Sequence, residues 1–180
     1  MFGATAVLAA MPGVAAAACP TEPTSQPFAH IGDNANYFLA PGGDFESAPE
    51  WSRYGNATVV ESGDNGVGAS KYAAKLTQSS SLTSPAFCVD AERPHLRLAA
   101  RALTDDGTLR LDAIDGDGTK VLLAKFDADH YQDWRVTRPV SLAAPLGIGE
   151  GETKMVKLRL TALNGAWLAD SVYVDPYTRG

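Results

Sequence analysis

Side chains able to perform catalysis are few in this sequence, and none has the spacing that enzymes use. The three histidines, His30, His95 and His130, fall in separate segments without metal-ligand spacing. The chain contains no Gly-x-Ser-x-Gly elbow, no His-Glu-x-x-His helix and no glycine-rich phosphate loop. A glycosidase or lyase remains an alternative, because carboxylates from distant strands can converge in a fold. The residue types therefore favour binding, and we expect no enzyme activity.

The run from Asp115 to Thr119, Asp-Gly-Asp-Gly-Thr, is similar in composition to a calcium-binding loop. An EF-hand loop needs glycine at its sixth position and a carboxylate at its twelfth. Those positions hold Lys120 and Phe126 here. Because Asp-Gly readily adopts the positive φ of a tight turn, the run predicts a β-hairpin instead.

Recognition of a sugar needs an exposed aromatic ring and planar polar side chains. Tyr131 and Trp134 lie in or beside the polar segment 127–134, which makes them the expected exposed pair. A row of charged residues alternates with apolar ones and is expected to face outward: Arg97, Arg101, Arg110, Asp112, Lys157 and Arg159. This row could hold an acidic or hydroxylated glycan, and the alternative is an ordinary solvated sheet face.

The N-terminal residues 1–18 carry no charge, are rich in alanine and contain Pro12-Gly13. The segment is too short and too weakly apolar for a membrane span, and it predicts a signal-peptide-like export segment. We therefore expect a secreted protein, with attachment to the cell envelope as an alternative.

Two cysteines follow this segment, Cys19 and Cys88. An even number in an exported protein predicts a disulfide, which would close a loop of roughly 70 residues and stabilise by about 4 kcal/mol. In the alternative, Cys19 is acylated after a degenerate lipoprotein box, Ala16 to Ala18, and Cys88 is free.

The length and the net charge of the chain limit which classes of partner and which domain organisation are possible. The chain has 180 residues, with 15 Lys and Arg against 21 Asp and Glu, a net charge of −6. This acidic balance argues against nucleic acid as a partner. We expect an extended arm over residues 19–36 and one domain over 37–180.

Short runs of alternating apolar and polar residues, separated by turn residues, predict an all-β fold. The clearest run is 154–162, in which Val156, Leu158 and Leu160 share one face. Runs at 95–102 and 109–113 are joined by Asp105-Asp106-Gly107, which predicts that they pair as antiparallel neighbours. About eight to ten such strands predict a two-sheet antiparallel jelly-roll β-sandwich.

Two motifs at opposite ends of the domain carry a resemblance. Gly42-Gly43-Asp44-Phe45-Glu46, followed by Trp51, resembles the opening of jelly-roll carbohydrate-binding modules with a galactose-binding-like fold. The run 166–174, which contains Asp170, resembles their closing strand. The order of motifs from Cys19 to Tyr177 also looks like that of a group of small secreted actinobacterial proteins of unassigned function.

The resemblance implies a structural calcium held by Glu46 and Asp170 with main-chain carbonyls. Calcium prefers hard oxygen ligands, and a cation would relieve the repulsion between two carboxylates. The alternative is that Glu46 caps a turn and Asp170 accepts backbone N–H groups, without an ion. Ser171 stands where those modules usually have Asp or Asn.

These observations together predict a secreted, non-catalytic binding module for an extracellular or cell-wall carbohydrate. A structural or protein-interaction component of the cell envelope is the alternative from another class.

Overall fold

The computed structural model describes residues 19–47, 51–68 and 70–175. The expected export segment, 1–18, lies outside these residues. Within the described part, the elements in chain order are two short 3-10 turns (η) and thirteen strands: η1 (Ala29–Ile31), β1 (Phe38–Leu39), β2 (Ser52–Tyr54), β3 (Thr58–Glu61), β4 (Tyr72–Leu76), β5 (Ser81–Thr83), β6 (Phe87–Asp90), β7 (His95–Ala102), β8 (Thr108–Ile114), β9 (Lys120–Asp127), η2 (Ala128–His130), β10 (Arg135–Val136), β11 (Val140–Ser141), β12 (Thr153–Asn164) and β13 (Trp167–Asp175). None of the described helical turns is long and apolar enough to cross a bilayer.

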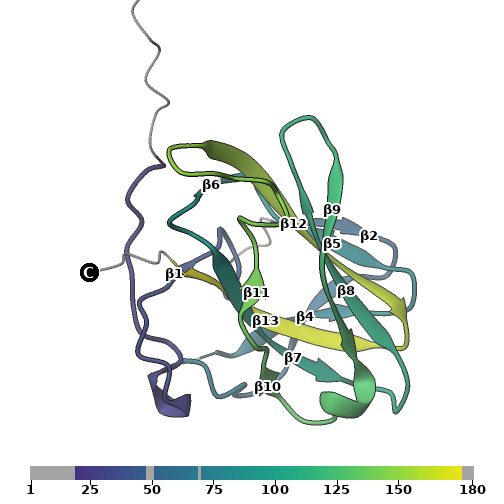
Figure 1. Cartoon of the computed structure of the whole chain (residues 1–180). Coiled ribbons are helices and arrows are strands. Elements are labelled where there is room, and N and C mark those ends of the chain that lie inside the picture. The colour runs from purple at the N-terminus through teal and green to yellow at the C-terminus, as the bar shows by residue number, and fades with distance from the viewer. Residues whose placement is uncertain (1–18, 48–50, 69, 176–180) are drawn as a thin grey trace, which may run out of the picture.

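The strands form two antiparallel sheets, as the sequence predicts (Figure 1). The first sheet has the order β10-β7-β13-β4-β3, with β1 on β13 and β11 on β7. The second has the order β2-β5-β12-β8-β9, with β6 on β12. The domain is therefore a β-sandwich of the jelly-roll class.

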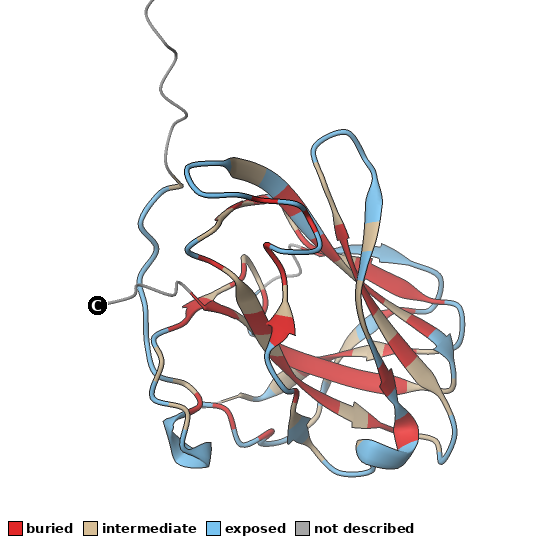
Figure 2. Cartoon of the chain, viewed as in Figure 1, coloured by how far each residue is buried: buried red, intermediate tan, exposed pale blue. Residues whose placement is uncertain are grey.

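The core lies between the two sheets, because alternate residues of each strand point inward. Val156, Leu158 and Leu160 of β12 are fully buried, as their spacing predicts. Trp51 and Trp167 are also buried. Figure 2 shows buried residues along the strands that face each other and exposed residues at the tip of the β8–β9 hairpin, which confirms the turn predicted there.

The predicted pairing of β7 with β8 is wrong, because the two strands lie in different sheets. Both sides of β7 are already occupied, by β13 on one and by β10 and β11 on the other. The connecting turn packs instead against the β12–β13 turn, where the hydroxyl of Thr104 accepts a hydrogen bond from the backbone N–H of Ala166 at 3.2 Å. The chain therefore crosses from one sheet to the other here.

The N-terminal arm covers the outer face of the first sheet and belongs to the folded body. Phe28 is completely buried and packs edge-on against Tyr37 and Tyr173. These rings form a second apolar cluster with Val67 and Ala99 of β7. The sequence predicts a boundary between arm and domain at residue 37, but the segments on both sides of it pack in the same cluster.

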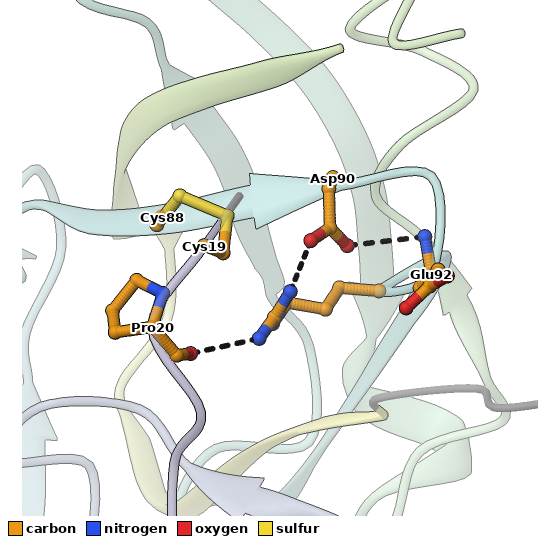
Figure 3. Close-up of polar contacts among 6 residues, drawn as sticks. Cys19, Pro20, Cys88, Asp90 and Glu92 are labelled. Carbon is orange, nitrogen blue, oxygen red and sulfur yellow. Dashed lines mark hydrogen bonds and ion pairs between the residues drawn. A yellow bond between two sulfur atoms is a disulfide. The ribbon is translucent and has the colours of Figure 1, made fainter. Parts of the chain in front are cut away.

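The arm is also tied covalently to the second sheet. Cys19 and Cys88 of β6 form a disulfide with a Cα–Cα distance of 5.4 Å, which confirms the predicted pairing (Figure 3). Arg93 forms an ion pair with Asp90 and donates a hydrogen bond to the carbonyl of Pro20 at 2.9 Å. Acylation of Cys19 is incompatible with this disulfide.

Candidate functional site

The loop before β2 is held against β13 by close backbone contact. The Val172 N–H donates to the Gly43 carbonyl at 2.9 Å, and the Ala40 N–H donates to the Val172 carbonyl at 2.9 Å. A Cβ on Gly43 would lie 2.8 Å from the Val172 carbonyl oxygen, so only glycine fits without a shift. Phe45 is buried against Trp51. This packing places Glu46 next to β13.

Two residues before Val172 on β13 is Asp170, which is fully buried. The register between β13 and β7 shifts between Asp170 and Tyr173, and Ser171 adopts a positive φ of 53°. The Ser171 N–H donates to Asp170 Oδ1 at 2.6 Å. Trp167 and Ala169 point into the main core, so alternation places Asp170 on the opposite face of the strand, and the bulge follows directly after it.

Glu46 and Asp170 converge on one hydroxyl. Ser70 Oγ lies 3.5 Å from Glu46 Oε1 and hydrogen-bonds to Asp170 Oδ2. Two backbone N–H groups at the start of β4, those of Lys71 and Tyr72, donate to Glu46 Oε1 at 2.6 and 2.7 Å. Segments more than a hundred positions apart thus lie side by side, as the resemblance implies.

Burial raises the pKa of Asp170 to about 7, and the nearby carboxylates of Glu46 and Asp44 add to the increase. The hydrogen bonds from Ser70 and from the Ser171 N–H oppose it by stabilising the ionised form. A proton or a cation would therefore lower the free energy of the folded state at this position.

The oxygen chemistry of the cluster fits calcium. Two carboxylates and the hydroxyls of Ser70 and Ser171 are hard donors, and no described residue donates a hydrogen bond to Glu46 Oε2. The described residues contain no group of three or more His, Cys, Asp or Glu side chains placed to hold a metal. Two carboxylates do not make up such a group, so an ion at this position would also need neutral oxygen ligands.

Asn65 and Ser70 belong to this cluster and were not expected from the sequence. Buried Asn65 donates through Nδ2 to Asp170 Oδ2 and to Ser171 Oγ, and its Oδ1 accepts the Val67 N–H at 2.7 Å. Both residues lie in the loop between β3 and β4, which comes close to β13 only in the folded structure. Asn65-Gly66 signals a turn in the sequence but does not indicate a partner.

A second candidate surface is the outer face of the second sheet. Here the strand register places polar residues directly opposite one another in two rows, one across five strands and one across three, with Ser81 and Asp112 buried among them. We call these residues the sheet-face band: Tyr54, Ser81, Thr161, Arg110 and Lys125 in one row, and Thr83, Arg159 and Asp112 in the other.

Specific contacts orient the side chains of this band. Arg110 forms an ion pair with Asp112 at 2.7 Å, and Arg159 donates to the Ser81 hydroxyl at 2.9 Å. Tyr54 at the end of the band is 67% exposed, so its ring is free to contact a ligand. The sequence predicted Arg110, Asp112 and Arg159 on an outward face, and it did not point to Tyr54.

The single row of six charged residues expected from the sequence is wrong, because its members lie on two sheets. Arg97 and Arg101 belong to β7 of the first sheet. Arg97 is covered by the arm, with an ion pair to Asp33 at 3.0 Å and its guanidinium 5.7 Å from the ring centre of Phe28. The Nε atoms of Arg97 and Arg101 are buried.

Tyr131 and Trp134 are not an exposed pair, because they pack in different clusters. The Tyr131 ring lies 5.6 Å from that of Phe126 and 6.0 Å from that of Trp167, on the main core. Trp134 packs against the cluster beneath the arm. Both side chains are half-buried, and only Tyr131 lines a groove beside β9.

Comparison with known proteins gives a match only at the level of structure: no family model matches the chain, and no curated protein matches it. The CBM22-1 xylan-binding domain of Paenibacillus barcinonensis Xyn10C has a TM-score of 0.52 at 13% identity, covering 76% of this chain and 94% of that one. The CBM22-1 and GH10 modules of Clostridium thermocellum xylanase 10B have a TM-score of 0.51 at 14% identity, covering 70% of this chain and 26% of that one. The chain therefore has the jelly-roll fold that these carbohydrate-binding modules share.

Proposed function

We propose that this protein is a secreted, non-catalytic module that binds an extracellular or cell-wall carbohydrate on the sheet-face band. The observation that carries the proposal is the band itself, which crosses five strands and ends at exposed Tyr54. Five strands about 4.8 Å apart span about 19 Å, enough for a short oligosaccharide. The fold shared with a xylan-binding domain and the disulfide, which persists in oxidising compartments, support the proposal.

The chemistry of the band suits a hydroxylated ligand. Arg110 and Arg159 present planar donors, and Thr83 and Thr161 add hydroxyls, while buried Asp112 holds Arg110 through their ion pair. The ion pair and the bond to Ser81 hold both guanidinium groups before a ligand arrives, which lowers the entropy lost on binding. The Tyr54 ring offers an apolar face on which sugar C–H groups can stack.

The first test is binding of the wild-type protein to a panel of soluble polysaccharides, measured by affinity electrophoresis and calorimetry. We expect Tyr54→Ala and Arg159→Ala each to weaken binding about tenfold, equivalent to about 1.4 kcal/mol. Arg53→Ala is the matched control, because Arg53 is exposed on the same strand but on its other side, and we expect a change below about twofold.

Absence of wild-type binding across the panel would remove the proposal. Binding that survives both substitutions would keep the function and reject the band as its site. Release of reducing sugar during the same incubations would show that the module is not purely a binding protein.

A further inference from the structure

A groove runs along the open side of the sandwich, where an edge of one sheet faces an edge of the other. Its lining places it between β9, the last strand of the second sheet, and the β10–β11 segment, which pairs with β7 on the side away from β13; Figure 1 shows these strands. Its cavity volume is about 660 Å³. The apolar part of the lining includes Leu123, Phe126, Val136 and Val140.

Three cations line this groove without a partner. Lys125, Arg135 and Arg138 are exposed, and none forms an ion pair or side-chain hydrogen bond with a described residue. The lining contains one carboxylate, Asp127, while His130 lies 3.7 Å from Asp129. A protein of net charge −6 thus collects unpaired positive charge in one groove.

Tyr131 stands within reach of these charges. It lines the same groove as Arg135 and Arg138. Burial raises the pKa of its hydroxyl, and the positive charges of these two residues act in the opposite direction. Its ring is supported from behind by Phe126 and Trp167. The groove therefore combines a rigid ring, apolar walls and three cations.

We infer that this groove binds an acidic polysaccharide, with carboxylates of successive sugar units pairing with Lys125, Arg135 and Arg138. Guanidinium groups bind carboxylates through two parallel hydrogen bonds, and the cations here have no competing partner among the described residues. A polymer suits the site better than a single anion, because the cations come from two segments on opposite sides of the groove. The inference rests on the proposed carbohydrate-binding function and names the ligand class of a second surface, which shares Lys125 with the sheet-face band.

The test compares polygalacturonate with its fully methyl-esterified form, which keeps the sugar chain and removes the charge. In low salt, we expect wild-type protein to bind polygalacturonate at least tenfold more tightly, with an advantage that shrinks as salt is added. The variant Arg135→Gln/Arg138→Gln should lose at least tenfold for polygalacturonate and keep its affinity for neutral polysaccharides.

The control Arg53→Gln/Lys120→Gln removes the same charge from exposed positions outside the groove lining, and it should bind polygalacturonate like wild type. Near-ultraviolet circular dichroism of each variant checks that the fold is intact. If the control lost affinity for polygalacturonate to the same extent, net charge alone would explain the loss. The groove would then be rejected as the binding site.

The remaining outcomes separate the two proposals. Equal affinity for the charged and esterified polymers would reject the acidic ligand and leave carbohydrate binding in place. No binding to any polysaccharide would reject both proposals. Tighter binding of single-stranded DNA than of polygalacturonate would overturn the inference in favour of a polyphosphate ligand.

Discussion

Asp170 is a carboxyl group in a position where ionisation is unfavourable. It is fully buried, receives hydrogen bonds from Asn65, Ser70 and the Ser171 backbone, and lies near Glu46. Ser171 beside it and Phe45 beside Glu46 both have positive φ values, 53° and 54°. Non-glycine residues in this conformation are strained, and such strain is common at functional sites. The titration of Asp170 is therefore the most direct way to measure whether this cluster binds a proton or a cation.

In the calcium-free protein, Asp170 should make stability decrease as pH rises. Its folded pKa of about 7 lies above the ordinary value of 3.8, so the folded state binds the proton more tightly. The contribution is complete below the unfolded pKa and is lost as pH rises through 7, a change of roughly 4 kcal/mol. Urea unfolding between pH 4 and 8, with chelator present, should show wild type losing stability relative to Asp170→Asn. Parallel curves for the two proteins would show that Asp170 titrates normally.

We propose that calcium replaces the proton at this cluster when it is available. Binding at a concentration roughly 100 times Kd would stabilise the fold by about 2.7 kcal/mol, so adding chelator should lower Tm. Glu46→Gln should remove most of this response. Asp129→Asn, an exposed acid in η2, should respond as wild type does. A Tm indifferent to calcium and chelator would favour hydrogen bonding without an ion.

Among the elements, the N-terminal arm has the largest effect on which surfaces remain free. It buries Phe28 on the first sheet and pairs Asp33 with Arg97, so the outer face of that sheet is covered over β7. The outer face of the second sheet keeps its polar band and exposed Tyr54. The arm therefore explains why the two faces of one sandwich differ in their capacity to bind a ligand.

Loss of the disulfide should destabilise the fold chiefly by freeing this arm. The bond joins residues 69 positions apart. In the chain-entropy model, its removal in Cys19→Ser/Cys88→Ser costs about 4 kcal/mol. Hydrogen exchange should show lost protection at Ser25 and Tyr37, whose N–H groups bond to each other's carbonyls, before loss in β12. An unchanged unfolding midpoint would mean that the packing of Phe28 alone holds the arm.

At the scale of the whole molecule, the candidate surfaces arise from how the two sheets are assembled. The sheet-face band needs the register of β2, β5, β12, β8 and β9, and the groove needs two edges from different sheets. Within one strand, only alternation determines which side a residue takes. This is why Arg110 and Arg159 were recognised as outward residues, whereas Tyr54 and Arg138 carried no signal of their own.

The sequence by itself determined the local features: the alternation in β12, the Asp-Gly hairpin between β8 and β9, and the one disulfide that two cysteines allow. The proximity of Glu46 to Asp170 could also be predicted from the sequence, because the two motifs resemble those of a known fold. Only the tertiary structure decided that β7 and β8 lie in different sheets, that Arg97 is covered, and that Asn65 and Ser70 join the carboxylates. The reason is physical: periodicity reports which face of a strand is apolar, whereas the choice of neighbour depends on packing between segments far apart in the chain.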